Sequence, residues 1–279
     1  MVSTLAAPGS TRAPEGGTRA AVRLGAVSYL NVEPMVYGLD RDERFSLLRE
    51  VPARVAERLH AGEIDLGTIP SIEYAFGDYA IVPGIAIGSH GPVRSVNLYH
   101  QRPVSELRRV ALDTSSRTSV ALLKVLLRER LGRDPEYIEM APSLEAMLGS
   151  ADAALMIGDP ALYSEGAVEQ LDLGLAWQQS TGLPFVYAFW AGPQGVIDEA
   201  GIAALQSALA SGRKAVREIA KSYLAHGADH AGMNETYLTE HIQFELGAAE
   251  LLGLREFYRR AFALGLISRI PELRFHGHR

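Results

Sequence analysis

The amino-acid sequence predicts an α/β protein built from two lobes. Short apolar segments alternate with longer segments whose apolar residues recur at helical spacing, which is typical of a mostly parallel sheet covered by helices. This alternation begins near residue 22 and begins again near residue 109. The length of 279 residues exceeds one ordinary core and suits two units of about 100–150 residues each.

The first lobe is expected to begin with a β-α-β-α-β unit, an order that implies parallel strands joined by helices. One expected helix places Val55 and Leu59 on the same face, and Gly62 stands near its end. The expected elements are strands over 22–27, 45–51 and 64–69, with helices over 33–39 and 53–62.

A second α/β unit is expected downstream. The segment 116–132 is its clearest helix, because Val120, Leu123 and Leu127 lie along one stripe. The expected strands of this unit cover residues 109–113, 136–140, 153–157 and 171–174.

Two more strands, 93–100 and 185–191, are expected to cross between the lobes, and helices are expected over 202–227 and 248–267. Such a discontinuous first lobe indicates a hinged protein with a cleft between its halves. The expected division is a disordered tail over 1–20, a first lobe over 21–97 plus 189–279, and a second lobe over 98–188.

Composition argues against several functions. The formal net charge of −6 does not suit a nucleic-acid surface, which needs clustered Lys and Arg. Without cysteine the chain has no disulfide, no thiolate nucleophile and no cysteine-based metal site. Residues 1–20 contain no apolar core of signal-peptide length, and no segment approaches the roughly 18 apolar residues of a membrane helix. We therefore expect a cytoplasmic protein without membrane contact.

Ligands of open parallel sheets sit beyond the carboxyl ends of the strands, and this rule selects a set of loops that should face one cleft. The candidate binding residues in these loops are Ser28, Ser71, Ser115, Ser116, Arg117, Thr118, Ser119, Gly158, Asp159 and Pro184, together with Asn31 and Ser95.

The segment DTSSRTS, residues 113–119, carries the clearest chemical signal. Five hydroxyl residues and Arg117 surround an expected helix N-terminus, where free N–H groups and the helix dipole favour an anion. Arg117 can grip a carboxylate through two hydrogen bonds. A carboxylate fits better than a phosphate, since the loop lacks a glycine-rich cradle. A serine N-cap beside a solvated Arg is the alternative.

Three further polar residues have both a binding and a structural interpretation. The amide of Asn31 can hold a substrate hydroxyl or carboxylate, although an Asn shortly before Pro34 is also a common helix cap. Ser95 either points into the cleft or bonds its own strand. Asp159 either orients a ligand hydroxyl or caps a helix starting at Pro160, and the cap is the commoner role. Tyr29 is expected to pack.

No metal site is expected. His226 and His230 stand four residues apart, as two ligands on one helix do, but the sequence offers no evident third ligand. The C-terminal HGH sequence, which begins at His276, is expected to be a frayed end.

Six motifs together resemble the chorismate dehydratase family of the futalosine route to menaquinone. They occur in order between about residues 22 and 270: GAVSYLNVEPMVYGL, GEIDLGTIPSIEY, GPVRSVNLY, LDTSSRTSVALLKVLL, ALMIGDPAL and TGLPFVYAFWA. The resemblance implies a two-lobed type II periplasmic-binding-protein-like fold in a cytoplasmic enzyme that has no known cofactor. It implies conversion of chorismate into 3-[(1-carboxyvinyl)oxy]benzoate and water.

The same resemblance implies catalytic roles for Asn31 and Ser95 and carboxylate binding by Ser115–Ser119. Whether the substrate's own carboxylate or a protein group takes the proton stays open, as do the role of Glu33, the extent of lobe closure and the choice between monomer and homodimer. Two other functions remain as alternatives: a solute-binding protein for a small carboxylate, and the sister 1,4-dihydroxy-6-naphthoate synthase, whose first loop is less similar to SYLN.

Overall fold

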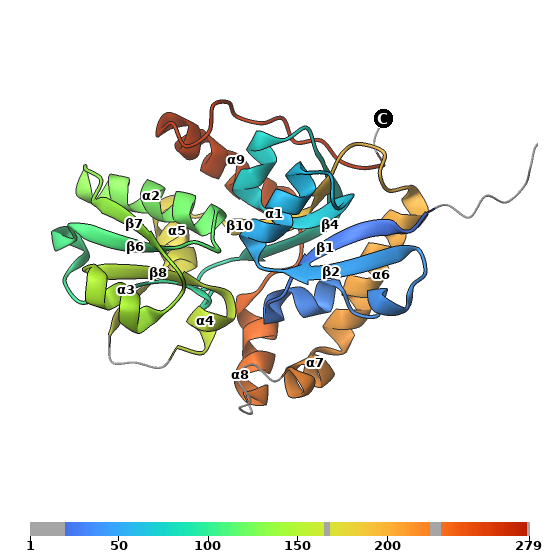
Figure 1. The fold of residues 1–279 in the computed structure, drawn as a ribbon, viewed down its shortest axis with the longest axis horizontal. Coiled ribbons are helices and arrows are strands. Elements are labelled where there is room, and N and C mark those ends of the chain that lie inside the picture. Colours follow the sequence, from blue (N-terminus) through green and yellow to red (C-terminus); the bar gives the residue numbers. More distant parts are fainter. Residues whose placement is uncertain (1–19, 165–167, 224–229, 278–279) are drawn as a thin grey trace, which may run out of the picture.

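The computed structural model describes residues 20–164, 168–223 and 230–277. Within them the chain forms two five-stranded sheets, each covered by helices, which lie side by side (Figure 1). The predicted α/β class with two halves is confirmed. Of the expected tail, residues 1–19 lie outside the described part of the chain.

The first sheet has the strand order β2-β1-β3-β10-β4, in which β10 alone runs antiparallel to its neighbours. Every residue of β3 is buried, because helices cover both faces of this sheet, as the near-continuous apolar strands predict. The strands are β1 (Val22–Val27), β2 (Phe45–Glu50), β3 (Leu66–Pro70), β4 (Ala80–Ser89) and β10 (Phe185–Gly192).

The second sheet repeats this pattern in the order β7-β6-β8-β5-β9, and here β5 is the antiparallel strand. Its strands are β5 (Val96–His100), β6 (Arg109–Asp113), β7 (Glu136–Met140), β8 (Ala153–Ile157) and β9 (Glu169–Asp172). In both sheets, therefore, the antiparallel strand follows a segment that enters from the other sheet.

Neither of the two strands expected to cross between the halves pairs with both sheets. β5 pairs only within the second sheet and β10 only within the first. The chain instead crosses in the short segments 90–95 and 182–184, which lie between these strands and the preceding elements. We propose that the lobes divide there, close to the boundaries expected after residues 97 and 188.

Most expected helices are present, with shifted ends. The 3₁₀-helix η1 (Leu30–Met35) replaces the expected helix over 33–39, and residues expected as one long helix from 202 form two helices. The expected strand over 171–174 is wrong beyond Asp172, where a helix begins. The α-helices are α1 (Pro52–His60), α2 (Thr118–Leu131), α3 (Leu144–Ser150), α4 (Gly158–Leu162), α5 (Leu173–Thr181), α6 (Glu199–Lys214), α7 (Val216–Ser222), α8 (Ala231–Thr236) and α9 (Ala248–Ala263).

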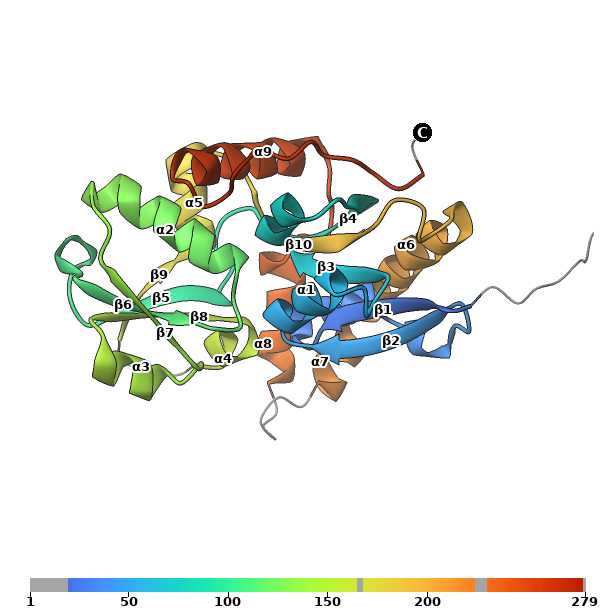
Figure 2. The ribbon, with the colours of Figure 1, turned by 45° about the horizontal axis from the view of Figure 1, so that its top comes forward.

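Helix α9 joins the two halves. It contacts both α2 and β10, and it runs along α5 and α2 in Figure 2. Its Phe257 packs edge-on against Phe185, with ring centroids 5.0 Å apart, and Phe185 packs in the same way against Trp177 at 5.2 Å. This aromatic cluster at the second crossing segment provides apolar burial that holds the C-terminal helix against that segment.

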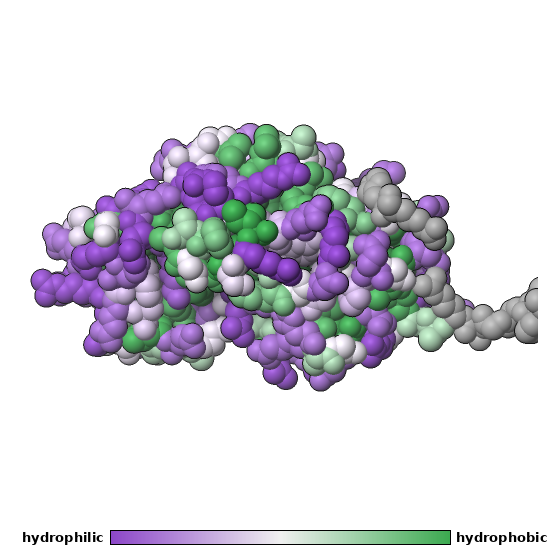
Figure 3. Space-filling view, turned by 90° about the horizontal axis from the view of Figure 1, so that it is seen from above, coloured by the Kyte–Doolittle hydropathy of each residue, from purple (hydrophilic) through white to green (hydrophobic). Residues whose placement is uncertain are grey.

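The surface is mixed in character, and its exposed large hydrophobic side chains include Phe76 and Leu252. Figure 3 shows mostly hydrophilic residues over the second sheet and more hydrophobic residues near the middle of that face. Among the helices of the described residues, none combines the length and the apolar character that crossing a membrane requires.

The expectation of a frayed C-terminal end is wrong for His276. Its backbone N–H donates to the carbonyl of Ile81, and the preceding Phe275 forms a parallel bridge with the same residue. The His276 side chain is 1% exposed. Burial disfavours the charged imidazolium and therefore lowers the pKa of His276 below its usual 6.5.

The buried imidazole predicts an acid-sensitive contribution to stability. Below pH 6.5 the unfolded chain binds a proton at His276 that the folded protein does not, so the free energy of unfolding falls as the pH falls. Urea unfolding at pH 7 and at about pH 5 should therefore show a larger loss for the wild type than for His276→Leu. Equal losses in both proteins would contradict the buried neutral state.

A second prediction concerns the contact between α6 and η1. A Cβ on Gly212 would lie 2.1 Å from the carbonyl oxygen of Pro34, so Gly212→Ala must push η1 away. We expect it to cost about 1–3 kcal/mol in the free energy of unfolding. Gly149→Ala is the matched control, because nothing lies within 4 Å of its added Cβ and alanine favours a helix. A Gly212→Ala protein as stable as this control in urea would refute the close approach.

Candidate functional site

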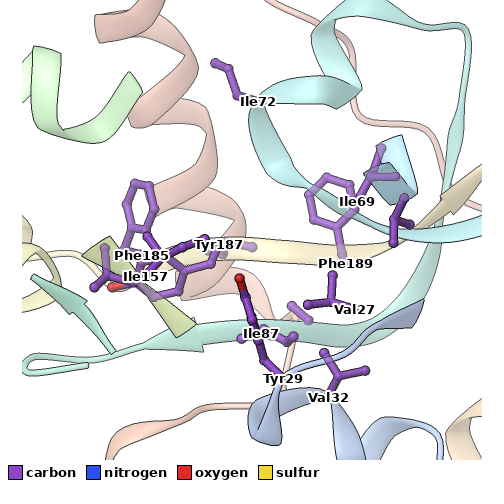
Figure 4. Packing of buried hydrophobic residues seen from close by; sticks show 14 of the residues in the cluster. Val27, Tyr29, Val32, Ile69, Ile72, Ile87, Ile157, Phe185, Tyr187 and Phe189 are labelled. Atoms are coloured by element: carbon purple, nitrogen blue, oxygen red, sulfur yellow. The ribbon is translucent and has the colours of Figure 1, made fainter. Parts of the chain in front are cut away.

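A pocket lies where segments of the two sheets meet. Its walls are mostly apolar, and they come from β1, β3, β4 and β10 on one side and from β5, α2 and the end of β8 on the other. Figure 4 shows five of the wall residues around this region: Val27, Tyr29, Ile87, Ile157 and Tyr187.

Only part of the predicted set lines this pocket. Asn31, Ser95, Ser116, Arg117, Thr118, Ser119 and Gly158 line it. The structure places the other predicted residues elsewhere: Ser28, Ser71, Ser115, Asp159 and Pro184 are not among the lining residues.

The N-terminus of α2 and the loop before it lie at the pocket. The first N–H groups of a helix have no partner within the helix, and among the described residues no side chain caps this end. Ser116 has a buried hydroxyl without a hydrogen-bond partner in the described structure. Arg117 also lines the pocket, while its guanidinium lies 3.2 Å from Glu57. These groups form a donor-rich, electropositive wall.

Other residues of the same loop hold it in place. The hydroxyl of Ser115 donates to Asp113 at 2.6 Å, and Asp113 is buried beneath the loop. Thr118 accepts a hydrogen bond from the backbone N–H of Ile72 at 3.1 Å. Ser71 is fully buried and donates to the carbonyl of Val186 at 2.8 Å. These hydrogen bonds fix the loop and the adjoining first-sheet segment, so Ser71 and Ser115 support the pocket, while Thr118 both lines and supports it.

Asn31 and Ser95 meet at one tyrosine. The amide nitrogen of Asn31 donates to the hydroxyl of Tyr237 at 3.1 Å, and that hydroxyl donates to Ser95 Oγ at 2.7 Å. The amide oxygen of Asn31 is buried and has no hydrogen-bond partner among the described residues. The helix-cap interpretation of Asn31 does not describe this geometry, because the residue lies inside η1.

A strained turn presents Ser95. Arg94 adopts a left-handed backbone with φ of 62°, which is costly for a residue other than glycine. The carboxylate of Asp172 accepts hydrogen bonds from the N–H groups of Val93 and Arg94, and it also caps α5. Asp172 therefore stabilises the turn that carries Ser95 into the pocket.

Asp159 joins the two halves instead of capping its own helix. One carboxylate oxygen accepts from the N–H of Leu30 at 3.1 Å, and the other accepts from the hydroxyl of Tyr223. No side chain caps α4 among the described residues. Asp159 thus stabilises the N-terminus of η1, the helix that carries Asn31.

Gly158 lets an aromatic ring approach the backbone. It has φ of 62°, and a Cβ there would lie 2.4 Å from the ring of Tyr29. Burial raises the pKa of Tyr29 to about 12. Tyr29 therefore packs as expected and also forms a wall of the pocket.

Two remaining candidates lie away from this chemistry. Glu33 forms an ion pair with Arg49 at 2.5 Å and does not line the pocket. His230 stacks on Tyr163 with ring centroids 4.7 Å apart, whereas His226 lies outside the described residues. In the described part of the chain no three His, Asp or Glu side chains form a possible metal site.

Sequence reasoning missed Tyr237, Asp172 and Tyr187. Tyr237 is separated from Asn31 by 206 positions, so no local pattern connects them. Asp172 stands in a segment expected as a strand, and only its N-cap position hints at its role. Tyr187 lines the pocket from β10, and its hydroxyl lies 3.0 Å from that of Ser89.

Comparisons with known proteins agree with this architecture. Residues 22–263 match the family model described as Menaquinone biosynthesis. The chain is 35% identical to the chorismate dehydratase of Thermus thermophilus over 264 residues, which cover 87% of this chain and 95% of that enzyme.

Solved structures of binding proteins share the fold. The alkanesulfonate-binding protein SsuA of Xanthomonas axonopodis pv. citri, bound to MOPS, is similar with a TM-score of 0.67 at 18% identity, over 92% of this chain and 96% of that chain. A crystal structure of an Archaeoglobus fulgidus protein has a TM-score of 0.72 at 16% identity, over 90% and 100%. These likenesses confirm the periplasmic-binding-protein-like fold. The family-model match and the Thermus relative confirm the resemblance seen in the motifs, and on these two findings the chain belongs to the menaquinone biosynthesis family.

Proposed function

We propose that this protein is a chorismate dehydratase, a cytoplasmic carbon–oxygen lyase that converts chorismate into 3-[(1-carboxyvinyl)oxy]benzoate and water in the futalosine route to menaquinone. The observation that carries the proposal is the 35% identity, over 87% of the chain, to an enzyme named chorismate dehydratase. The chemistry of the pocket supports the same function.

The pocket suits a cyclic dicarboxylate. Chorismate has two carboxylates, an enol ether and a ring hydroxyl on an otherwise apolar ring. The uncapped α2 N-terminus, the free hydroxyl of Ser116 and the guanidinium of Arg117 together provide donors for one carboxylate. Apolar walls such as Val27 and Ile157 provide a surface for the ring.

The described lining residues include no His, Asp, Glu or Lys that could act as a conventional base. Tyr29 and Tyr187 line the pocket, but burial raises the pKa of each phenol, so neither is a ready proton acceptor at neutral pH. We therefore assign the proton transfer to the substrate's own enolpyruvyl carboxylate, held over the ring carbon that carries the ether.

The elimination is balanced without a cofactor. The ether-bearing carbon loses its proton to that carboxylate, and the resulting electron pair is conjugated through the ring alkene with the ring carboxylate. The neighbouring carbon then releases its hydroxyl, which leaves as water once protonated, and the ring becomes aromatic. Asn31 and Ser95 would hold the enolpyruvyl arm and bond the leaving hydroxyl, while the electropositive wall would stabilise charge on the ring carboxylate.

A passive receptor for a small carboxylate is the competing function, and the likeness to SsuA is the observation that favours it. Incubating the purified protein with chorismate separates the two functions. A dehydratase yields an aromatic product, seen by ultraviolet absorption and by a mass lower by one water. A receptor binds chorismate and returns it unchanged. A 1,4-dihydroxy-6-naphthoate synthase would leave chorismate unconverted as well.

Removing the amide of Asn31 should damage turnover more than binding. Asn31→Ala removes a buried carbonyl that has no protein partner in the described structure and that we assign to the substrate, and we expect kcat to fall about 100-fold with a much smaller change in KM. Steady-state kinetics on chorismate give both constants. Full turnover by Asn31→Ala would remove this residue from the mechanism.

Arg117 should act mainly on substrate affinity. Among the described lining residues, Arg117 alone has a charged side chain. Arg117→Ala should therefore raise KM for chorismate, a dianion, about tenfold. Arg54→Ala is the matched control, because Arg54 also pairs with Glu57 but does not line the pocket. If the two variants had the same KM, the carboxylate would have to bind elsewhere.

A further inference from the structure

The phenol of Tyr237 connects the two proposed catalytic side chains. Tyr237 opens the π-helix η6 (Tyr237–His241) and is 2% exposed. Short π-helical segments occur disproportionately at functional sites, because they place a side chain where a regular helix would not. The Tyr237 hydroxyl lies between Asn31 and Ser95, which come from opposite sides of the pocket.

The hydrogen bonds that connect Asn31, Tyr237 and Ser95 run in one direction. The hydroxyl group of Tyr237 has one hydrogen, which it donates to Ser95 Oγ. The oxygen of the same hydroxyl accepts a hydrogen bond from Asn31 Nδ2. Ser95 therefore accepts from Tyr237 and has its own hydrogen left for another acceptor. Asn31 spends one N–H on Tyr237, and its carbonyl oxygen is held without a protein partner in the described structure.

We propose that Tyr237 is a positioning residue that makes Ser95 a hydrogen-bond donor, and Asn31 a hydrogen-bond acceptor, toward the substrate. This inference rests on the proposed dehydratase function, in which Ser95 would donate to an oxygen of the leaving hydroxyl or the enolpyruvyl arm. Without the phenol, the Ser95 hydroxyl rotates freely and the Asn31 amide can turn over, so the pocket loses its ordered set of donor and acceptor.

Burial keeps this arrangement stable over the working pH range. Removal from water is the largest cause that raises the pKa of Tyr237 well above its usual value. The phenol stays protonated at neutral pH, so it remains a donor to Ser95 and takes no proton from the substrate.

The first test is Tyr237→Phe, which keeps the ring and removes the hydroxyl. We expect kcat on chorismate to fall about 10- to 100-fold, with KM changing less than about threefold. Tyr74→Phe is the matched control: Tyr74 is also 2% exposed, donates to the carbonyl of Glu272 and accepts from the N–H of Arg274, but neither of these partners lines the pocket, whereas Asn31 and Ser95 do. It should lose stability and keep its kcat. A Tyr237→Phe enzyme with the wild-type kcat would overturn the proposal.

A double-mutant cycle separates positioning from general damage. If Tyr237 acts through Ser95 as well as Asn31, then Tyr237→Phe should lower the kcat of the Ser95→Ala variant by a smaller factor than it lowers the kcat of the wild type. Independent, multiplying losses would contradict the proposal. Should Tyr237→Phe not fold, Asn31→Asp tests the chain from its other end. The new carboxylate would accept the hydrogen of the Tyr237 hydroxyl, which would then no longer be donated to Ser95. A wild-type kcat in that variant would also overturn the proposal.

The outcome is distinguishable from failure of the proposed function. A wild-type protein that leaves chorismate unchanged refutes the dehydratase, whatever the variants do. The hydrogen-bonded chain is then tested by stability alone. In urea unfolding, the costs of Tyr237→Phe and Ser95→Ala should be non-additive by at least about threefold in the unfolding equilibrium constant. Additive costs would refute the chain itself.

Discussion

The pocket depends on the seam at which the loop before α2 meets the first half of the molecule. The N–H of Ala53 donates to the carbonyl of Ser115 at 3.1 Å, and the N–H of Ile72 donates to Thr118 at the same distance. These bonds join the first turns of α1 and η3 to the α2 N-terminus. Buried backbone N–H groups require hydrogen-bond partners. The N–H groups of Ala53 and Ile72 find their partners only when the two halves lie close together.

The seam explains why the serine-rich loop has more hydroxyls than a substrate needs. Some of them, such as Ser115 and Thr118, hold the loop against its own strand and against the other half. Ser116 keeps its hydroxyl free of protein partners in the described structure and faces the cavity. One short segment therefore joins the two halves and presents donors to the pocket.

Much of this arrangement could be predicted from sequence. Apolar strands such as 22–27 and the stripe of α2 carry local periodicity, and the rule about strand ends selected the loops that hold Asn31 and Ser116. The features that could not be predicted depend on long-range contacts. Tyr237 and His276 owe their burial to contacts with residues far away in the chain, which no local pattern reports. β4 was overlooked because Pro83 and Gly84 interrupt its apolar pattern.

The close approach of Tyr29 to Gly158 has a consequence for which ligands can enter. Because Gly158 has no Cβ, the ring of Tyr29 can lie close to the backbone at the end of β8, and the pocket keeps its present size. Any larger residue there would drive the ring inward and shorten the space for a six-membered carbocycle. The glycine at position 158 thus leaves room for the ring of a ligand, independently of the charge of that ligand.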